Sequence, residues 1–304
     1  MTRPLERPTR RRRPPSQWRS ALLFLLPLLA VYAVYYAYSI VFLAQTSTQR
    51  VGISLLRPVQ VGFDNFILLL QDAVFWQSIG NNLVFAGVSI GVSLTIAFFI
   101  AVALSTGVRG RKVFYLVFLL PALMPLSLVA TIFGSMLQSR NGAVNETLRA
   151  IGLGDLAQSW LTTPQWAYIA VILVFCYLIG LPIMYYTADL SALPTSALEA
   201  ALLDGAGTFR IMRSIIYPMM RSTHITVILA LLLGSFRALE QVLFSTDGGP
   251  GSTTEIVGTY LYSSVNSGGK TIGFAASASI VVLLIALVIS VLQMFATRTR
   301  KADR

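Results

Sequence analysis

Residues 83–104 read LVFAGVSIGVSLTIAFFIAVAL, an apolar run without a single Asp, Glu, Lys or Arg. A helix rises about 1.5 Å per residue, so a run of this length crosses the roughly 30 Å hydrocarbon core of a bilayer. In lipid, backbone polar groups must bond within their own segment, which favours a helix over an open strand. The run therefore predicts a membrane-spanning helix.

The 304-residue chain has five further apolar runs of similar length, and four of these also lack charged residues. Together the six runs cover residues 21–43, 83–104, 113–137, 166–186, 225–244 and 272–295. Charged residues make up 12% of the chain, whereas a soluble domain carries about 25%. The sequence thus predicts an all-α, polytopic membrane protein with six transmembrane helices and argues against a water-soluble protein.

Basic residues are distributed unevenly between the two sides of this predicted topology. With the N-terminus inside, 17 Lys and Arg lie on the inner side and five on the outer side. An excess of basic residues marks the cytoplasmic side, so both termini are expected in the cytoplasm. We therefore expect a basic cytoplasmic tail at 1–20, a six-helix domain at 21–297 and a second cytoplasmic tail at 298–304. The arginine-rich start could imitate a signal peptide, but the run at 21–43 exceeds the usual signal core and predicts a retained helix.

Other functional classes find little support. The net charge of +11 lies at chain ends and in short loops rather than on an aromatic-bearing face, so no nucleic-acid partner is expected and membrane lipid is favoured. The single Cys176 and single His224 offer no metal-ligand spacing, and no metal site is expected. Gly87, Ser89 and Gly91 match the G-x-S-x-G motif of hydrolases with a serine nucleophile. They lie inside an apolar helix, however, where glycines serve close packing.

Two outer loops are long enough to hold short helices of their own. Residues 63–77 carry apolar residues in amphipathic order, and residues 141–151 are a second candidate. Neither loop can bury a core large enough for a separate domain.

The longest inner loop carries a predicted elbow at 194–218. Ser196 and Glu199 have capping-box spacing, which predicts a helix beginning near Ala197. Gly205 suits the left-handed residue that ends such a helix. A second helix is expected over 208–216 and should stop before Pro218. The small residues around the bend would let another protein approach closely.

This elbow resembles the EAA loop of ABC importer permeases. The matching positions are Glu199, Ala200, Ala201, Asp204, Gly205, Ala206 and Pro218. Further matches to the carbohydrate-uptake, maltose-type branch cover most of the chain from residue 22 onward. They include Gly62 to Phe66, Leu120-Pro121, Gly248-Gly249-Pro250 and Gly273 to Ala276.

The resemblance implies a type I importer permease fold and a place in the bacterial inner or plasma membrane. It implies that this chain is not an enzyme, carries no cofactor, and imports a sugar or a sugar-like solute. Its implied partners are an ABC ATPase dimer that holds ATP and Mg, a second homologous permease in a heterodimer, and an extracytoplasmic solute-binding protein. It also implies that Glu199 and the neighbouring motif residues dock the coupling helix in the ATPase.

A solute pathway is expected along the helices that leave the elbow. The fourth run contains Tyr177 and Gly180-Leu181-Pro182, where the proline leaves the carbonyl of Leu178 without its helical donor. This feature is either a solute contact or a plain kink. The fifth run adds Ser235, Arg237, Glu240 and Gln241. Arg237 and Glu240 can pair on one helix face, and they serve either solute or structure.

Two other classes of function remain open from the residues alone. The chain could be a stand-alone six-helix channel or secondary transporter, or, less favourably, a membrane enzyme. The complete motif in the inner loop favours the importer.

Overall fold

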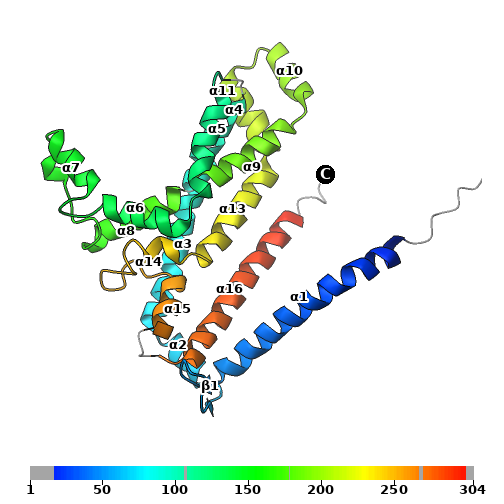
Figure 1. The fold of residues 1–304 in the computed structure, drawn as a ribbon. Coiled ribbons are helices and arrows are strands. Elements are labelled where there is room, and N and C mark those ends of the chain that lie inside the picture. Colours follow the sequence, from blue (N-terminus) through cyan, green and yellow to red (C-terminus); the bar gives the residue numbers. More distant parts are fainter. Residues whose placement is uncertain (1–16, 106–107, 178, 267–269, 299–304) are drawn as a thin grey trace, which may run out of the picture.

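Long apolar helices dominate the structure, a computed structural model that describes residues 17–105, 108–177, 179–266 and 270–298 (Figure 1). The expected tails at 1–20 and 298–304 lie almost entirely outside these residues. Within them, four helices are long and apolar enough to cross a membrane, and six spans result if each of two bent helix pairs counts as one. The predicted all-α fold is confirmed.

In chain order, the elements before the elbow are α1 Gln17–Ser47, β1 Gln49–Arg50, β2 Val59–Gln60, α2 Asp64–Leu70, α3 Ala73–Val92, the π turn η1 Ser93–Ala97, α4 Phe98–Ser105, α5 Arg111–Leu119, the 3-10 turn η2 Leu120–Leu123, α6 Leu126–Met136, α7 Ala143–Ala150, the 3-10 turn η3 Gly154–Leu156, α8 Pro164–Tyr177 and α9 Gly180–Ser191. The elbow and the remaining chain form α10 Thr195–Leu203, α11 Thr208–Ile211, the π turn η4 Met212–Ile216, α12 Tyr217–Met219, α13 Arg221–Phe236, α14 Glu240–Leu243, α15 Val257–Asn266 and α16 Ile272–Arg298. The two short strands pair antiparallel, with Gln49 opposite Gln60.

Helix α1 stands apart from the rest of the molecule. It meets α16 near β1 and then diverges from the bundle (Figure 1). None of its most apolar window is buried, and its tyrosines, such as Tyr35 at 68% exposure, face outward. Apart from its contact with α16, the apolar surface of α1 therefore stays exposed in the described part of this chain.

The second span is longer than the sequence predicts. It runs from Ala73 to Ser105 through α3, η1 and α4, whereas the apolar run begins at residue 83. Asp72 caps α3 by accepting from the backbone N–H groups of Val74 and Phe75, and it divides the helix expected at 63–77 into α2 and the start of α3. The polar Asn81 and Asn82 hide this earlier start in the sequence, yet both are buried in the fold. The helix expected at 141–151 is present as α7.

The third span, expected as one helix over 113–137, is divided into two segments by a sharp bend. The segments 111–123 and 126–136 meet at 96°, so α6 runs across the direction of α5 (Figure 1). Met124 is extended, with ψ 145, because a residue before proline avoids the helical region and Pro125 follows it.

The fifth span differs at both ends from the run at 225–244. Segments 208–219 and 221–236 meet at 67°, and the helix ends at Phe236 rather than at residue 244. A buried cluster that includes Phe98, Tyr186 and Val227 packs α4, α9 and α13 together. This packing fixes the two helices that lead into and out of the elbow.

Candidate functional site

The elbow is built on α10, which lies with α11 at the end of the molecule opposite α2 and β1 (Figure 1). The helix begins at Thr195, directly after Pro194, and no side chain caps it. The predicted capping box of Ser196 and Glu199 is therefore wrong. Pro194 has φ −65, a value that leads the chain into a helix at Thr195, two residues before the start that the box requires.

The end of α10 agrees with the prediction for Gly205. This residue has φ +75, the left-handed conformation that glycine adopts without steric cost. The Gly205 N–H donates to the carbonyl of Leu202 at 3.0 Å, and the Ala206 N–H donates to that of Ala201 at 2.9 Å. These two bonds form a Schellman motif, which satisfies the last carbonyls and turns the chain sharply.

The exposed face of the elbow is more apolar than the small-residue pattern suggests. Leu202 is 63% exposed and Leu203 90% exposed, and Glu199 lies exposed on the same short helix. Within the described residues Glu199 and Asp204 take part in neither of the two ion pairs. An exposed leucine beside an unpaired carboxylate is a surface suited to a protein partner with an apolar hollow and a basic group.

The second arm of the elbow continues through Pro218, so the predicted stop before this proline is wrong. The π turn η4 shifts the hydrogen-bond pattern, and Pro218 then falls in the first turn of α12, where the missing N–H is tolerated. The bend comes instead at Met220, between α12 and α13.

Two polar contacts tie α9 to α13 across the base of the elbow. The His224 ring lies 3.1 Å from the carbonyl of Tyr217 through Nε2, and 2.8 Å from the Tyr186 hydroxyl through Nδ1. Because a carbonyl only accepts, Nε2 carries a proton, and with a neutral ring Nδ1 then accepts from the Tyr186 hydroxyl. Thr223 also donates to the carboxylate of Asp189. Helices α9 and α13, which lead into and out of the elbow, are thus joined by hydrogen bonds that the sequence pattern did not reveal.

The six candidate pathway residues have different surroundings. Gly180 is buried, and a Cβ there would collide with the carbonyl of Phe118 in α5. Ser235 is buried and exchanges hydrogen bonds with Asn82. The Tyr177 ring packs against Phe133 of α6, with ring centroids 5.2 Å apart.

The remaining three residues lie beyond the end of α13. Arg237 is exposed and follows the last helical residue, whereas Glu240 begins α14. The two do not form an ion pair in the described structure, because the helix that would have aligned them ends at Phe236. Gln241 is 8% exposed, and its Oε1 is buried without a hydrogen-bond partner. Helix α14 packs against α6 and α8, the two helices that carry Phe133 and Tyr177. The predicted free carbonyl of Leu178 lies outside the described residues.

Ser89 has a structural role in this fold. Its hydroxyl donates to the carbonyl of Phe175 at 3.2 Å inside packed helices, so it is not poised as a nucleophile. Within the described ranges no group of three or more His, Cys, Asp or Glu side chains is arranged to hold a metal ion.

A charged cluster on the side opposite the elbow joins three segments that are distant in sequence. The Asp72 carboxylate accepts from the Tyr260 hydroxyl at 2.7 Å and from the Lys270 ammonium at 2.6 Å. The ammonium also lies over the Tyr260 ring, 4.3 Å from its centroid. Partial burial acts to raise the Asp72 pKa, but the bonds and charge of Lys270 and Tyr260 outweigh it and hold this pKa below its usual value.

This cluster predicts a loss of stability in acid. A carboxylate with a lowered pKa stabilises the fold above its unfolded pKa of about 3.9, and this contribution is lost as pH falls through the folded value. We expect Asp72→Asn to lower the melting temperature at pH 7 and to reduce the further loss between pH 5 and pH 3. Thermal unfolding of the detergent-solubilised chain measures both effects. The control Asp155→Asn, at an exposed site, should leave the acid dependence unchanged; equal curves for Asp72→Asn and wild type would contradict the assignment.

Comparison with known proteins shows which protein family this chain is similar to. The family model described as binding-protein-dependent transport system inner membrane component matches residues 87–301. The probable ABC transporter permease protein YurN of Bacillus subtilis is 30% identical over 246 residues, which cover 80% of this chain and 84% of that protein. The lactose transport system permease protein LacF of Rhizobium radiobacter is 29% identical over 283 residues, which cover 92% of this chain and 94% of that protein.

A solved structure has the same fold. A chain in the crystal structure of a bacterial alginate ABC transporter, in complex with an alginate pentasaccharide-bound periplasmic protein, matches with a TM-score of 0.77 at 23% identity. The match covers 93% of this chain and 96% of that chain.

Proposed function

Because this chain belongs to the family of inner-membrane components of binding-protein-dependent transport systems, it is a multi-pass permease subunit of an ABC importer rather than an enzyme, and we propose that it imports a sugar or a sugar-like solute. The solute class is supported by the permease LacF, whose name gives lactose as its cargo. The family description also supports a solute-binding protein as the partner that delivers the solute.

The proposal for how ATP hydrolysis is coupled to transport rests on the elbow. We propose that α10 docks in a cleft of a separate ATPase, with Glu199 facing a basic group and Leu203 filling an apolar hollow. The motif residues Ala200, Ala201, Asp204, Gly205 and Ala206 shape the rest of this contact. The ATPase would hold ATP and Mg, and its closure would move the elbow as a rigid body.

The bonds across the base of the elbow support this mechanism. Because Tyr186 is bonded to His224 and Asp189 to Thr223, a push on α10 is shared by α9 and α13. These two helices would rotate together and alternately open the pathway to either side of the membrane. The excess of basic residues on the side of the elbow supports a cytoplasmic elbow and, with it, two cytoplasmic termini.

A second homologous permease would complete the pathway. The exposed apolar surface of α1 supports this partner, because in the described part of this chain the helix contacts α16 but buries none of its most apolar window. Within the pathway, the unpaired Oε1 of Gln241 is the group best suited to accept a sugar hydroxyl, with Tyr177 offering an aromatic face. Arg237 and Glu240 are proposed to line the outer entrance, whereas Gly180 and Ser235 position the helices around the pathway.

Reconstitution tests the proposal. The chain is assembled in liposomes with candidate ATPase, second permease and binding protein, and ATP hydrolysis is measured with and without the sugar. We expect stimulation by solute only when this chain is present, and about a tenfold or larger loss of docking and uptake in Glu199→Ala, because its basic partner would be left buried and unpaired.

The matched control is Glu146→Ala, which removes an exposed carboxylate from α7 on the other side of the membrane. Its exposed ion pair with Arg149 contributes little, so uptake should stay near the wild-type rate. Normal docking and uptake by Glu199→Ala would remove the elbow from the coupling mechanism.

A further inference from the structure

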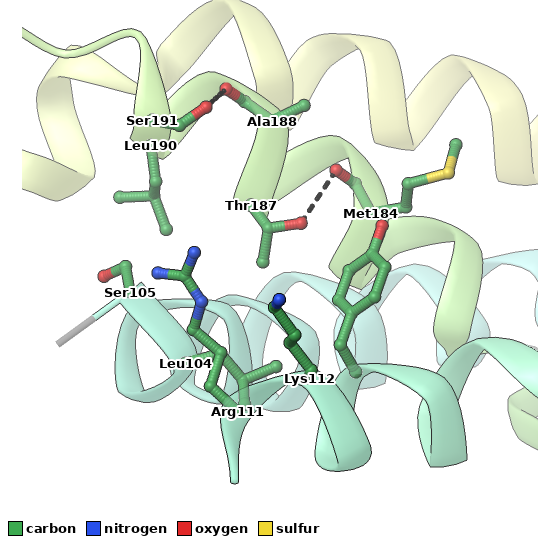
Figure 2. A pocket seen from close by; sticks show the side chains of 10 residues that line it. Leu104, Ser105, Arg111, Lys112, Met184, Thr187, Ala188, Leu190 and Ser191 are labelled. Atoms are coloured by element: carbon green, nitrogen blue, oxygen red, sulfur yellow. Dashed lines mark hydrogen bonds between the residues drawn. The ribbon is translucent and has the colours of Figure 1, made fainter. Parts of the chain in front are cut away.

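A cavity of about 500 Å³ lies beside the elbow, between the end of α4, the start of α5 and the last turns of α9 (Figure 2). It is separate from the candidate pathway residues, none of which lines it. Its volume falls in the range of about 300–1,000 Å³ that is typical of small-molecule sites.

Two cations dominate the polar side of this cavity. Arg111 and Lys112 form the first turn of α5 and point toward Thr187 of α9 (Figure 2). In the part of the chain that the structure describes, neither side chain has a hydrogen-bond or ion-pair partner. No acidic residue lies in this first turn, although the positive end of a helix favours an anion there. The cavity therefore carries an uncompensated positive charge.

Three hydroxyl groups also line the cavity, two from α9 and one from the end of α4. Ser105, Thr187 and Ser191 each donate to a carbonyl of their own helix, at distances between 2.6 and 2.8 Å. A hydroxyl that donates in this way keeps acceptor capacity on its oxygen. The site thus offers cations for a phosphate and acceptors for ligand hydroxyl groups.

The remaining wall is apolar and continues onto the membrane-facing surface. Leu104, Tyr115, Met184 and Leu190 line the cavity. Next to it, α5 buries none of its residues, and Val113 and Val117 are 64% and 59% exposed. A ligand with a charged head and a hydrocarbon tail would match both parts of this surface.

We propose that this cavity binds the headgroup of an anionic phospholipid with free glycerol hydroxyls, of the phosphatidylglycerol type. Arg111 and Lys112 hold the phosphate, the hydroxyl oxygens of Thr187 and Ser191 accept from the headgroup glycerol, and an acyl chain follows the apolar face of α5. With the elbow on the cytoplasmic side as proposed above, the lipid comes from the inner leaflet, where anionic headgroups attract basic residues. Because α9 leads directly into α10, a lipid bound here would brace the base of the elbow.

Lipid retention by the purified full-length chain tests this proposal without any transport assay, so its failure is distinct from a failure of the proposed function. The chain is exchanged into nanodiscs of phosphatidylglycerol and phosphatidylcholine, then released into detergent, and the lipid that remains bound is measured by mass spectrometry. We expect the wild type to retain phosphatidylglycerol preferentially, and Arg111→Gln with Lys112→Gln to reduce this retention roughly tenfold or more.

The matched control removes two exposed basic residues from the other side of the membrane, Arg57→Gln with Arg140→Gln, and should retain the lipid as the wild type does. A second set of nanodiscs contains phosphatidylglycerol and phosphatidic acid, which lacks the headgroup glycerol. In these, Thr187→Val should lower the preference of the chain for phosphatidylglycerol. Equal retention by wild type and the Arg111 and Lys112 double variant would overturn the proposal. So would displacement of bound lipid by inorganic phosphate alone, which indicates a site for a free anion. Loss of a co-purifying ATPase with unchanged lipid retention would assign the cations to a protein contact instead.

Discussion

Replacing Gly205 with proline should abolish transport while the membrane-spanning helices stay folded. Gly205 has φ +75, whereas proline is restricted to φ near −65, so the left-handed turn that ends α10 cannot form. Proline also removes the N–H that donates to Leu202. The docking surface on α10 would then point away from its proposed partner, and we expect solute uptake below about one tenth of the wild-type rate. Uptake into liposomes and circular dichroism of the same preparation measure the two effects.

Two variants at the same bend separate the backbone effect from other causes. No atom lies within 4 Å of a Cβ built at Gly205 or at Gly207, so steric collision contributes at neither position. Gly207 has φ −68 and ψ 156, which any residue adopts, and Gly207→Ala should transport normally. Gly205→Asn should keep most of the activity, because asparagine tolerates the left-handed conformation. If Gly205→Pro transported as well as Gly207→Ala, the rigid bend would have no role in coupling.

A single methyl group at Gly180 should destabilise the permease. Gly180 lies where α9 crosses α5, and a Cβ there would overlap the carbonyl oxygen of Phe118 and lie 3.3 Å from the Cα of Leu119. Backbone atoms of a packed helix cannot move aside as a flexible side chain does, so the two helices must separate. We expect Gly180→Ala to cost about 1–3 kcal/mol of stability. The melting temperature of the detergent-solubilised chain measures this cost. It is determined by following the loss of the monodisperse chromatographic peak after heating.

Gly91→Ala is the matched control for this prediction. It adds the same methyl group to another apolar helix, at a position where no atom lies within 4 Å of the new Cβ. We expect its melting temperature to match that of the wild type. Equal melting temperatures for Gly180→Ala and Gly91→Ala would show that α5 and α9 do not approach each other as closely as the structure has them.

The Asn81 and Asn82 pair shows why the sequence placed the second span ten residues too late. Both side chains look polar in a hydropathy pattern, but the fold supplies their partners. Asn81 donates to the carbonyls of Thr253 and Glu255, and Asn82 bonds to Ser235. These partners lie more than 150 residues away along the chain, so only the folded structure can reveal that the two amides are satisfied inside the bundle.

The two ends of α10 differ in how well the sequence predicted them. The left-handed Gly205 was predictable, because its conformation depends on the residue itself and on two neighbouring carbonyls. The start of the helix was not, since Pro194 and the Ser196–Glu199 box compete and the proline sets the entry. The same limit applies to Arg237 and Glu240, whose pairing required a helix that the fold ends at Phe236.

The sequence by itself determined the six apolar spans, the helical class and the motif of the inner loop. It could do so because a bilayer core imposes a fixed length on every crossing segment, and a left-handed turn requires a particular residue. The tertiary structure alone decided the 96° bend of the third span, the bonding of α9 to α13, and the cavity between α4, α5 and α9. Each of these depends on which distant segments pack together, and that choice is made by the fit of side chains across helices rather than by any local pattern.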